Sequence, residues 1–253
     1  MSDRASRWLL RRKPGAEAAV RLYCFPHSGA SPSEYMRWVD HLPGIEVLGV
    51  QGPGRGARID EPPYDDMGTL VDAILDEVVF EAPFVFFGHS LGALTAYEAA
   101  RALRDRGRPQ PEVLFASAMG APHLQPHTPP THHLDDVRLL RTVEAFGPLP
   151  TEVLDDPELR EIIVRLLRAD ARILDTYQHA PGLPLNLPVV ALGGASDTET
   201  EFLRGWTEHT TYPLSTHVLP GDHFYLRGQR EELLGIIRDT VRRRLDAPRE
   251  PEQ

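Results

Sequence analysis

The hydrophobic positions of this chain change their period repeatedly. Short runs of bulky apolar residues, such as "VLGV" at 47–50 and "FVFF" at 84–87, alternate with longer segments in which apolar residues recur every three or four positions. Continuous apolar runs are typical of buried parallel strands, and the longer period is typical of amphipathic helices. The pattern indicates a mostly parallel sheet covered by helices. It predicts strands at 20–25, 46–50, 84–87, 113–117, 188–192 and 215–219, and helices at 33–42, 67–80, 91–106, 198–209 and 230–245.

The alternation of strands and helices is interrupted once, between Ala121 and Leu187. This stretch holds a loop rich in proline and histidine and then two segments of helical period, "LDDVRLLRTVEAF" and "DPELREIIVRLLRADARILDTYQ". Asp156 suits the N-cap of the second helix, because Pro157 follows it at the first helical position. We therefore expect a single domain, residues 1–253, in which residues 121–187 form a helical insertion over one end of the sheet.

Charge and cysteine content restrict the possible partners. The formal net charge is -10 at pH 7, whereas nucleic acids and anionic membranes are bound by basic surfaces. We therefore expect neither as a partner, and no apolar stretch approaches the roughly 20 residues of a membrane span. The single cysteine, Cys24, lies in the apolar run "VRLYCFP", which predicts a buried thiol and no disulfide within the chain. These features predict a cytoplasmic protein.

The segment "FFGHSLGALTAYEAARAL", which begins at Phe86, places Ser90 between two glycines. It matches the pattern G-x-S-x-G in the required context, after a predicted strand and before a predicted helix. On such a sharp turn the strained backbone exposes the serine hydroxyl, and small flanking residues let the turn close. The N-terminus of the following helix also favours developing negative charge. The sequence therefore predicts a nucleophile at Ser90.

A serine hydroxyl needs a base, and on this pattern an acidic residue and then a histidine follow the serine along the chain. His223, in "LPGDHFYL", lies between the last predicted strand and the last helix and is the best-placed base. Asp197, in "GGASDTE", follows a strand at the carboxyl edge of the sheet, where such sites collect. Glu199 and Glu201 are the alternatives to Asp197 for the carboxylate that orients the imidazole.

The loop "CFPHSGASPSEY" follows the first strongly predicted strand. Its small residues leave backbone N–H groups free to bind the carbonyl oxygen of a substrate, as an oxyanion hole does. We expect one donor from Leu91, the residue after the nucleophile. The other donor is expected from His27 or Ser28, with Gly29 as a further possibility.

The remaining histidines could suggest a metal. His123, His127, His132 and His133 are irregularly spaced in a proline-rich segment, which favours a solvated loop over a set of metal ligands. His89, beside the nucleophile, is expected to point to the wrong side of the turn to act as the base. We expect neither a metal nor a cofactor.

Four blocks together resemble a known family: "CFPHSGAS", "VQGPGRGAR", "FFGHSLGALTAYEAA" and "LPGDHFYL". They are similar to the type II thioesterases, the editing hydrolases that accompany polyketide synthases and nonribosomal peptide synthetases. The likeness extends from about Leu22 to Leu245, and "ALGGASD" resembles the block with the acidic member of the triad. The chain departs from the family at Ala30, where a second glycine is usual, and in the loop "ASDTE".

The resemblance implies an α/β-hydrolase fold and a triad of Ser90, His223 and Asp197. It also implies that the substrate is an acyl group on the phosphopantetheine arm of an acyl or peptidyl carrier protein, and that the product is a free acid. The alternatives are another esterase of this fold, a thioesterase of fatty-acid synthesis, and a non-catalytic module that binds carrier proteins.

The helical insertion would then be a lid that shapes the acyl pocket. Phe146, Leu167, Ile173 and Tyr177 are the candidate lining residues, although apolar residues at helical spacing more often pack onto the body of the protein.

Carrier proteins of these systems are acidic, as the resemblance implies, so docking would need a local basic spot. Arg55 and Arg58, in "GPGRGAR", are the candidates. The alternative is that these two arginines hold their own loop in place through hydrogen bonds to backbone carbonyls.

Overall fold

The computed structural model describes residues 7–12, 18–124, 129–146 and 155–246. Within these residues seven strands form one sheet, in the order β1-β3-β2-β4-β5-β6-β7. The β1–β3 pair is antiparallel and all the other pairs are parallel. The strands are β1 (Leu9–Leu10), β2 (Val20–Phe25), β3 (Ile45–Val50), β4 (Phe84–His89), β5 (Leu114–Ser117), β6 (Val189–Gly194) and β7 (Ser215–Leu219).

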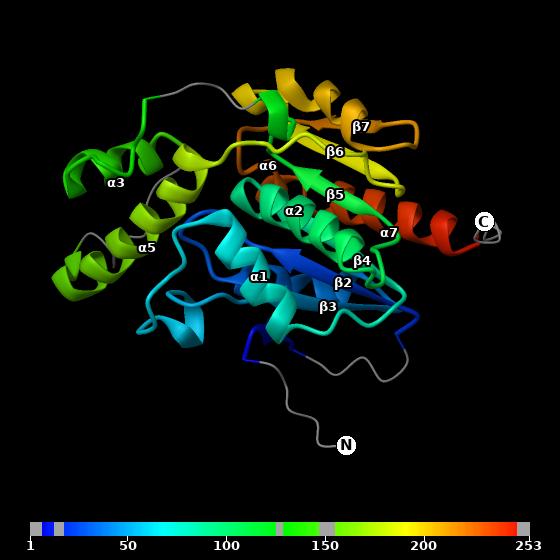
Figure 1. Ribbon diagram of the computed structural model, residues 1–253, viewed down its shortest axis with the longest axis horizontal. Coiled ribbons are helices and arrows are strands. Elements are labelled where there is room, and N and C mark those ends of the chain that lie inside the picture. Colours follow the sequence, from blue (N-terminus) through cyan, green and yellow to red (C-terminus); the bar gives the residue numbers. More distant parts are fainter. Residues whose placement is uncertain (1–6, 13–17, 125–128, 147–154, 247–253) are drawn as a thin grey trace.

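Helices cover both faces of the sheet (Figure 1). The helices α1 (Met67–Glu77) and α2 (Leu91–Asp105) pack on one face together with the 3-10 helix η4 (Thr198–His209). On the other face lie the 3-10 helix η1 (Pro32–His41) and the helices α6 (Tyr225–Gly228) and α7 (Arg230–Asp246). Two short 3-10 turns, η2 (Gly56–Arg58) and η3 (Pro122–Leu124), lie in the loops.

The run "FVFF" in the central strand β4 shows why the hydrophobic pattern is continuous. Phe84 and Phe86 belong to the core beneath α1 and α2, whereas Val85 and Phe87 belong to the core beneath η1 and α7. Successive side chains of a strand point to opposite faces, and here both faces are covered. All four side chains are 0% exposed, so each stabilises the fold by about 1.5–3 kcal/mol.

Among its described residues, the insertion supplies the helices α3 (Asp136–Glu144) and α5 (Pro157–Thr176), which lie beyond the carboxyl ends of the strands (Figure 1). They pack on each other around their own apolar cluster, which contains Leu139 and Leu167. The predicted N-cap is confirmed, because the Asp156 side chain accepts hydrogen bonds from the backbone N–H groups of Glu158 and Leu159. The described residues between 121 and 187 contain no strand, only an isolated bridge from Leu185 to Thr210.

The α/β architecture is as predicted, with local differences. The edge strand β1 was not predicted, because two residues are too few to give an alternating pattern. The segments 33–42 and 198–209 are 3-10 rather than α-helical. Helix α1 ends at Glu77, earlier than predicted, because Val78 has an extended backbone.

Two predictions from composition concern Cys24 and membranes. Cys24 is a free, fully buried cysteine in β2, as expected, and burial raises the pKa of its thiol. Within the described residues, no helix combines the length and the apolar character that are needed to cross a membrane.

Candidate functional site

Ser90 occupies a strained turn between β4 and α2. Its backbone φ is 56° and its ψ is -125°, a conformation that residues with side chains rarely adopt. A Cβ on Gly88 would lie 2.2 Å from the carbonyl oxygen of Gly92, and a Cβ on Gly92 would lie 2.1 Å from that of Phe25. Both glycines are therefore required, because the turn brings backbone against backbone. The turn presents Ser90 to a cavity at the carboxyl edge of the sheet.

We expect Gly92→Ala to lower the free energy of unfolding by about 1–3 kcal/mol or more, because the new methyl group would overlap the backbone of β2. Urea unfolding followed by circular dichroism would measure the change. Gly235→Ala is the matched control, since a Cβ there would have only the Arg238 side chain nearby, at 3.9 Å. Replacing glycine by alanine within a helix such as α7 should stabilise it slightly. Equal stability of the two variants would contradict the tight turn.

His223 and Asp197 lie together at the same edge of the sheet. Asp197 follows β6, and His223 lies on the loop between β7 and α6. The Nδ1 atom of His223 is 2.9 Å from Oδ2 of Asp197, and both residues are buried. An ionised carboxylate can only accept, so Nδ1 carries the proton and Nε2 is left as an acceptor. His223 lines the same cavity as Ser90.

The two alternative carboxylates are engaged elsewhere or exposed. Oε2 of Glu199 accepts a hydrogen bond of 2.7 Å from the backbone N–H of Gly120. Burial raises the pKa of the Glu199 carboxyl. Glu201 is exposed on η4. Of the three candidates, Asp197 alone has a hydrogen bond to His223.

The loop after β2, residues 27–30, forms another wall of the cavity and is called the oxyanion loop below. The backbone N–H of Gly29 donates to Oδ2 of Asp170 at 2.8 Å, and that of Ala30 donates to the carbonyl of His27 at 3.1 Å. Gly29 is therefore not available as an oxyanion donor. His27 and Ser28 both line the cavity and remain the candidates.

Two further histidines surround the site and are held neutral. Burial lowers the pKa of His27 to about 3 and that of His89 well below its ordinary range. His89 is fully buried, and its Nδ1 atom lies 2.8 Å from the Ser117 hydroxyl. It is directed into the core, as expected, and is not placed to act as the base. Of these three histidines, only His223 is paired with a carboxylate.

The cavity has a volume of about 720 Å³, within the range of about 300–1,000 Å³ that is usual for small-molecule sites. Of the predicted lining residues, Phe146, Leu167 and Tyr177 do line it. The Phe146 ring lies 5.0 Å from the His223 ring, which links the insertion to the site.

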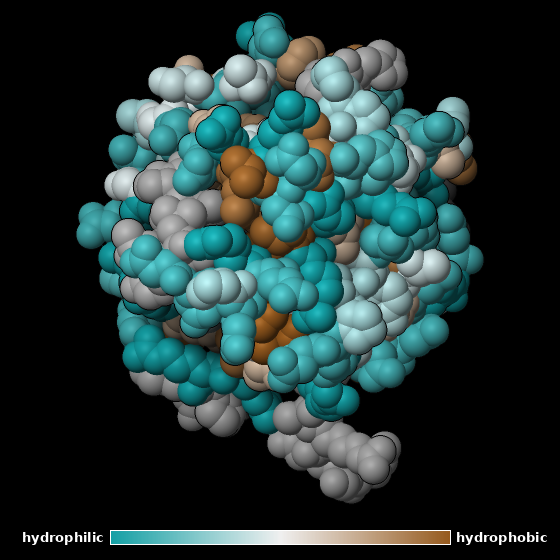
Figure 2. All heavy atoms as spheres, turned by 90° about the vertical axis from the view of Figure 1, so that its left-hand side faces the viewer, coloured by the Kyte–Doolittle hydropathy of each residue, from teal (hydrophilic) through white to brown (hydrophobic). Residues whose placement is uncertain are grey.

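Figure 2 views the end of the molecule where α3 and α5 lie, and apolar residues are exposed there among hydrophilic ones. Phe146 itself is 50% exposed.

The prediction for Ile173 is wrong. Ile173 is 1% exposed and packs into the core beneath α1 and α2 instead of lining the cavity. Sequence reasoning also missed Leu174, which does line it. The signal was present, because Leu174 lies seven residues after Leu167 and therefore on the same side of α5.

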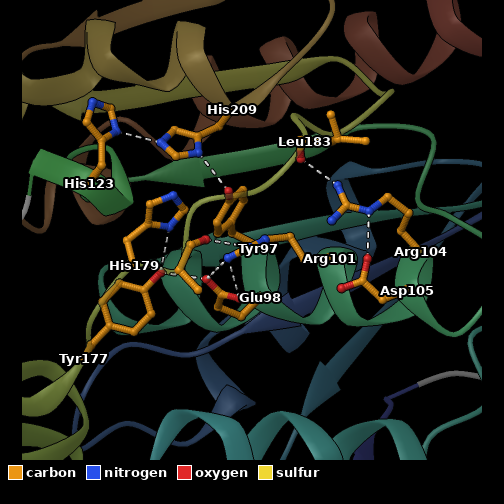
Figure 3. Close-up of polar contacts among 11 residues, drawn as sticks. Tyr97, Glu98, Arg101, Arg104, Asp105, His123, Tyr177, His179, Leu183 and His209 are labelled. Atoms are coloured by element: carbon orange, nitrogen blue, oxygen red, sulfur yellow. Dashed lines mark hydrogen bonds and ion pairs between the residues drawn. The ribbon is translucent and has the colours of Figure 1, made fainter.

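A polar network lies beside the cavity, which His123 and Tyr177 line. Figure 3 shows its side chains. The Tyr97 hydroxyl on α2 is 2.7 Å from Nδ1 of His209, and Nε2 of His209 is 2.7 Å from Nδ1 of His123. Burial raises the pKa of Tyr97 to about 12 and lowers that of His209 to about 3. Nearby, the Tyr177 hydroxyl donates to Glu98 at 2.6 Å. The network joins α2 to η3 and η4. Burial keeps its central histidine, His209, neutral at neutral pH.

The network predicts acid sensitivity of the fold. Between the ordinary histidine pKa of 6.5 and about 3, the unfolded chain binds a proton that folded His209 does not. Stability therefore falls as the pH decreases through this window, by about 2 kcal/mol at about pH 5 for this one residue. We expect His209→Asn to lower the melting temperature at neutral pH but to make its decline on acidification shallower. Parallel curves for the variant and the wild type would contradict this.

The expected solvated histidine loop is only partly correct. His132 lies 2.7 Å from Asp175 Oδ2, and His123 belongs to the network above, so neither is simply solvated. His127 lies outside the described residues. Within the described residues, no group of histidine, cysteine and acidic side chains could hold a metal ion.

The docking role predicted for Arg55 and Arg58 is wrong, because both side chains are buried. Arg58 donates to the carbonyl of Gln51 at 3.2 Å, pairs with Glu61 and lies over the Trp8 ring. Arg55 contacts Ala30 and Asp170. The alternative interpretation, that they hold their loop in place, agrees with these contacts.

We therefore expect Arg58→Ala to lower the melting temperature without a selective effect on carrier-linked substrates. Kinetics with an acyl carrier protein and with a small acyl thioester, each at two salt concentrations, would test this. A rise in KM for the carrier protein alone would restore the docking role.

Comparison with known proteins agrees with this geometry. A family model described as "Thioesterase domain" matches residues 20–241. The chain belongs to the thioesterase family. It is therefore a thioester hydrolase, and the family resemblance noted in the sequence is confirmed.

The relatives extend the comparison over nearly the whole chain. The thioesterase is 38% identical over 244 residues to linear gramicidin dehydrogenase LgrE of Brevibacillus parabrevis, covering 93% of each chain. It is 36% identical over 240 residues to thioesterase PikA5 of Streptomyces venezuelae, covering 92% of this chain and 85% of the relative. The name of LgrE describes a dehydrogenase, which we do not extend to this chain, since the family match and the serine turn are those of a hydrolase.

Among solved structures, the thioesterase is similar to the type II thioesterase BorB from the borrelidin biosynthetic cluster. The two are 35% identical with a TM-score of 0.81, over 92% of this chain and 96% of the other. This similarity confirms the α/β-hydrolase fold. It favours a type II thioesterase over the alternative functions considered from the sequence.

Proposed function

We propose that this thioesterase hydrolyses acyl groups from the phosphopantetheine arm of acyl or peptidyl carrier proteins. The observation that carries the proposal is that Ser90 and His223 line one cavity, next to the insertion, and that Asp197 pairs with His223. The likeness to a type II thioesterase of a biosynthetic cluster supports the carrier-linked substrate. A cytoplasmic location stays a prediction, with the single free Cys24 in its favour.

In the first step the Ser90 hydroxyl attacks the thioester carbonyl carbon while His223 Nε2 takes its proton. The tetrahedral intermediate collapses with cleavage of the carbon–sulfur bond, and His223 gives its proton to the departing thiolate, which leaves as the free thiol. A thiol with a pKa of roughly 8.5 is a good leaving group and needs little help from an acid. In the second step His223 removes a proton from water, which attacks the acyl-serine, and the free acid leaves as Ser90 regains its proton.

Asp197 accepts the Nδ1–H of His223 and stabilises the imidazolium that forms in both steps. The oxyanion would be bound by the backbone N–H of Leu91, at the start of α2, and by that of His27 or Ser28. His27 and His89 do not compete for the proton, because burial lowers the pKa of both. Their neutrality also avoids a second positive charge beside the imidazolium.

The insertion would act as the lid of the acyl site. Leu139 and Val143 of α3 and Leu167 and Leu174 of α5 supply its apolar wall. Apolar lining of this kind would bind the hydrocarbon part of an acyl chain by removing it from water.

The proposal is tested by comparing kcat/KM for one acyl group presented on a carrier protein, on coenzyme A and in a simple oxygen ester. We expect the carrier protein to be the best substrate and the ester the poorest. A clear preference for the ester would indicate a general esterase. Failure of Ser90 to react with a fluorophosphonate probe would indicate the non-catalytic module instead.

A further inference from the structure

The buried carboxylate of Asp170, on α5, is not used by the catalytic steps. It is 0% exposed, and a buried charge is unfavourable unless it is paired and hydrogen-bonded. Oδ1 accepts a hydrogen bond of 2.8 Å from Arg55 Nη2, and Oδ2 accepts one of 2.8 Å from the backbone N–H of Gly29. One side chain of the insertion thus joins two separate loops of the sheet.

Arg55 holds the same stretch of chain from a different direction. Its Nη1 atom donates to the carbonyl of Ala30 at 3.3 Å. The Arg55–Asp170 pair therefore contacts two consecutive residues of the oxyanion loop, the N–H of Gly29 and the carbonyl of Ala30. These residues directly follow His27 and Ser28, whose N–H groups are the candidate oxyanion donors.

The close approach of α5 to the oxyanion loop depends on a glycine. Gly29 has a φ of +73°, and a Cβ there would lie 2.6 Å from Leu167 Cδ2. Leu167 and Asp170 are three residues apart and lie on the same side of α5. The helix thus contacts Gly29 with an apolar side chain and holds its N–H with a charged one.

The glycines of the motif "GPGRGAR" place Arg55 for this contact. Gly54 has a φ of +80° and Gly56 a φ of +55°, and these left-handed conformations flank Arg55 on both sides. The arginine is directed inward, with a side chain that is 10% exposed. The motif therefore has a structural purpose that its sequence alone did not reveal.

We propose that Arg55 and Asp170 are positioning residues that set the oxyanion loop, and that they make the oxyanion hole depend on the placement of α5. The proposal rests on the proposed function, because it assumes that this loop stabilises the transition state. Neither residue is among those that line the Ser90 cavity. They act by fixing the peptide groups next to the donors, whose position relative to the developing charge decides how well they stabilise it.

The first test is Asp170→Asn, which keeps the shape of the side chain and removes its charge. We expect kcat for a small acyl thioester, such as an N-acetylcysteamine thioester, to fall by about 10- to 100-fold, below the effect of losing an oxyanion donor outright. KM should hardly change, because the cavity wall is intact. An unchanged kcat would overturn the proposal. The matched control is Glu46→Gln on β3, which removes another buried carboxylate that is paired with an arginine, Arg21 of β2. It should lower the melting temperature and leave kcat as it was.

A double variant separates positioning from stability. Asp170→Leu combined with Arg55→Met removes both charges, and such apolar replacement of a buried pair is often neutral or stabilising. Positioning predicts that the melting temperature recovers relative to Asp170→Asn while kcat stays low. Recovery of both would show a merely structural role and overturn the proposal.

If the double variant does not fold, Arg55→Lys distinguishes positioning from a merely structural role. It keeps the charge but loses the forked pair of donors to Ala30 and Asp170. A reduced kcat at an unchanged KM would support positioning, and an unchanged kcat would overturn it. These outcomes are distinct from failure of the proposed function, which would appear as a wild-type protein that does not hydrolyse acyl thioesters at all.

Discussion

Ser90→Ala is expected to lower kcat for an acyl thioester by at least about 10⁴-fold. The hydroxyl is the proposed nucleophile, and no neighbouring group on the turn can replace it. The fold should be unaffected, because the strained backbone at φ 56° is set by the contacts of Gly88 and Gly92 and not by the serine side chain. Steady-state release of the thiol and a thermal melt would measure the two quantities.

Ser196→Ala is a suitable control for this experiment, since Ser196 is an exposed serine beside Asp197. It should keep both turnover and melting temperature. Wild-type turnover in Ser90→Ala would show that the hydrolysis does not pass through this residue, and the proposed mechanism would then be wrong.

The serine turn could be predicted from the sequence because its determinants are local. The strand, the two glycines and the helix follow one another within a few residues, and each has a recognisable pattern. The strand β4 was equally clear, since burial of both its faces makes it continuously apolar. The edge strand β1 has only two residues, partly exposed, and gives no such signal.

Contacts between distant segments could not be predicted in the same way. At about 100° per residue, Leu167 and Ile173 lie about 120° apart around α5. Both belong to a helical apolar pattern, but the sequence does not say which neighbour each side faces. Leu167 meets the cavity, whereas Ile173 meets the core beneath α1 and α2.

The docking role predicted for the arginines of "GPGRGAR" was wrong for a related reason. Arginine is usually exposed, so a loop arginine was interpreted as a surface charge. Burial of Arg55 is possible only because Asp170, 115 residues later, neutralises it. A single sequence without its fold contains no indication of that pairing.

The assignment of the base and its carboxylate leads to the second large effect. His223→Ala should lower kcat about as much as Ser90→Ala, because a serine without its base is a weak nucleophile. The melting temperature of His223→Ala should change little, because the ring lies at the cavity and not within the main core clusters. Retention of turnover by His223→Ala would point to another base.

Asp197→Asn tests the carboxylate, and we expect kcat to fall by about 10⁴-fold. An amide in this position can present N–H to Nδ1 of His223, which favours the tautomer with its proton on Nε2 and removes the acceptor that Ser90 needs. Glu199→Gln is the matched comparison, because Glu199 also lines the cavity and follows the same strand, yet its Oε2 accepts from Gly120. The amide oxygen of glutamine can keep that hydrogen bond, so kcat should change little. The reverse result, with Asp197→Asn silent and Glu199→Gln inactive, would transfer the orienting role to Glu199, and the 2.9 Å contact between His223 and Asp197 would then have no catalytic meaning.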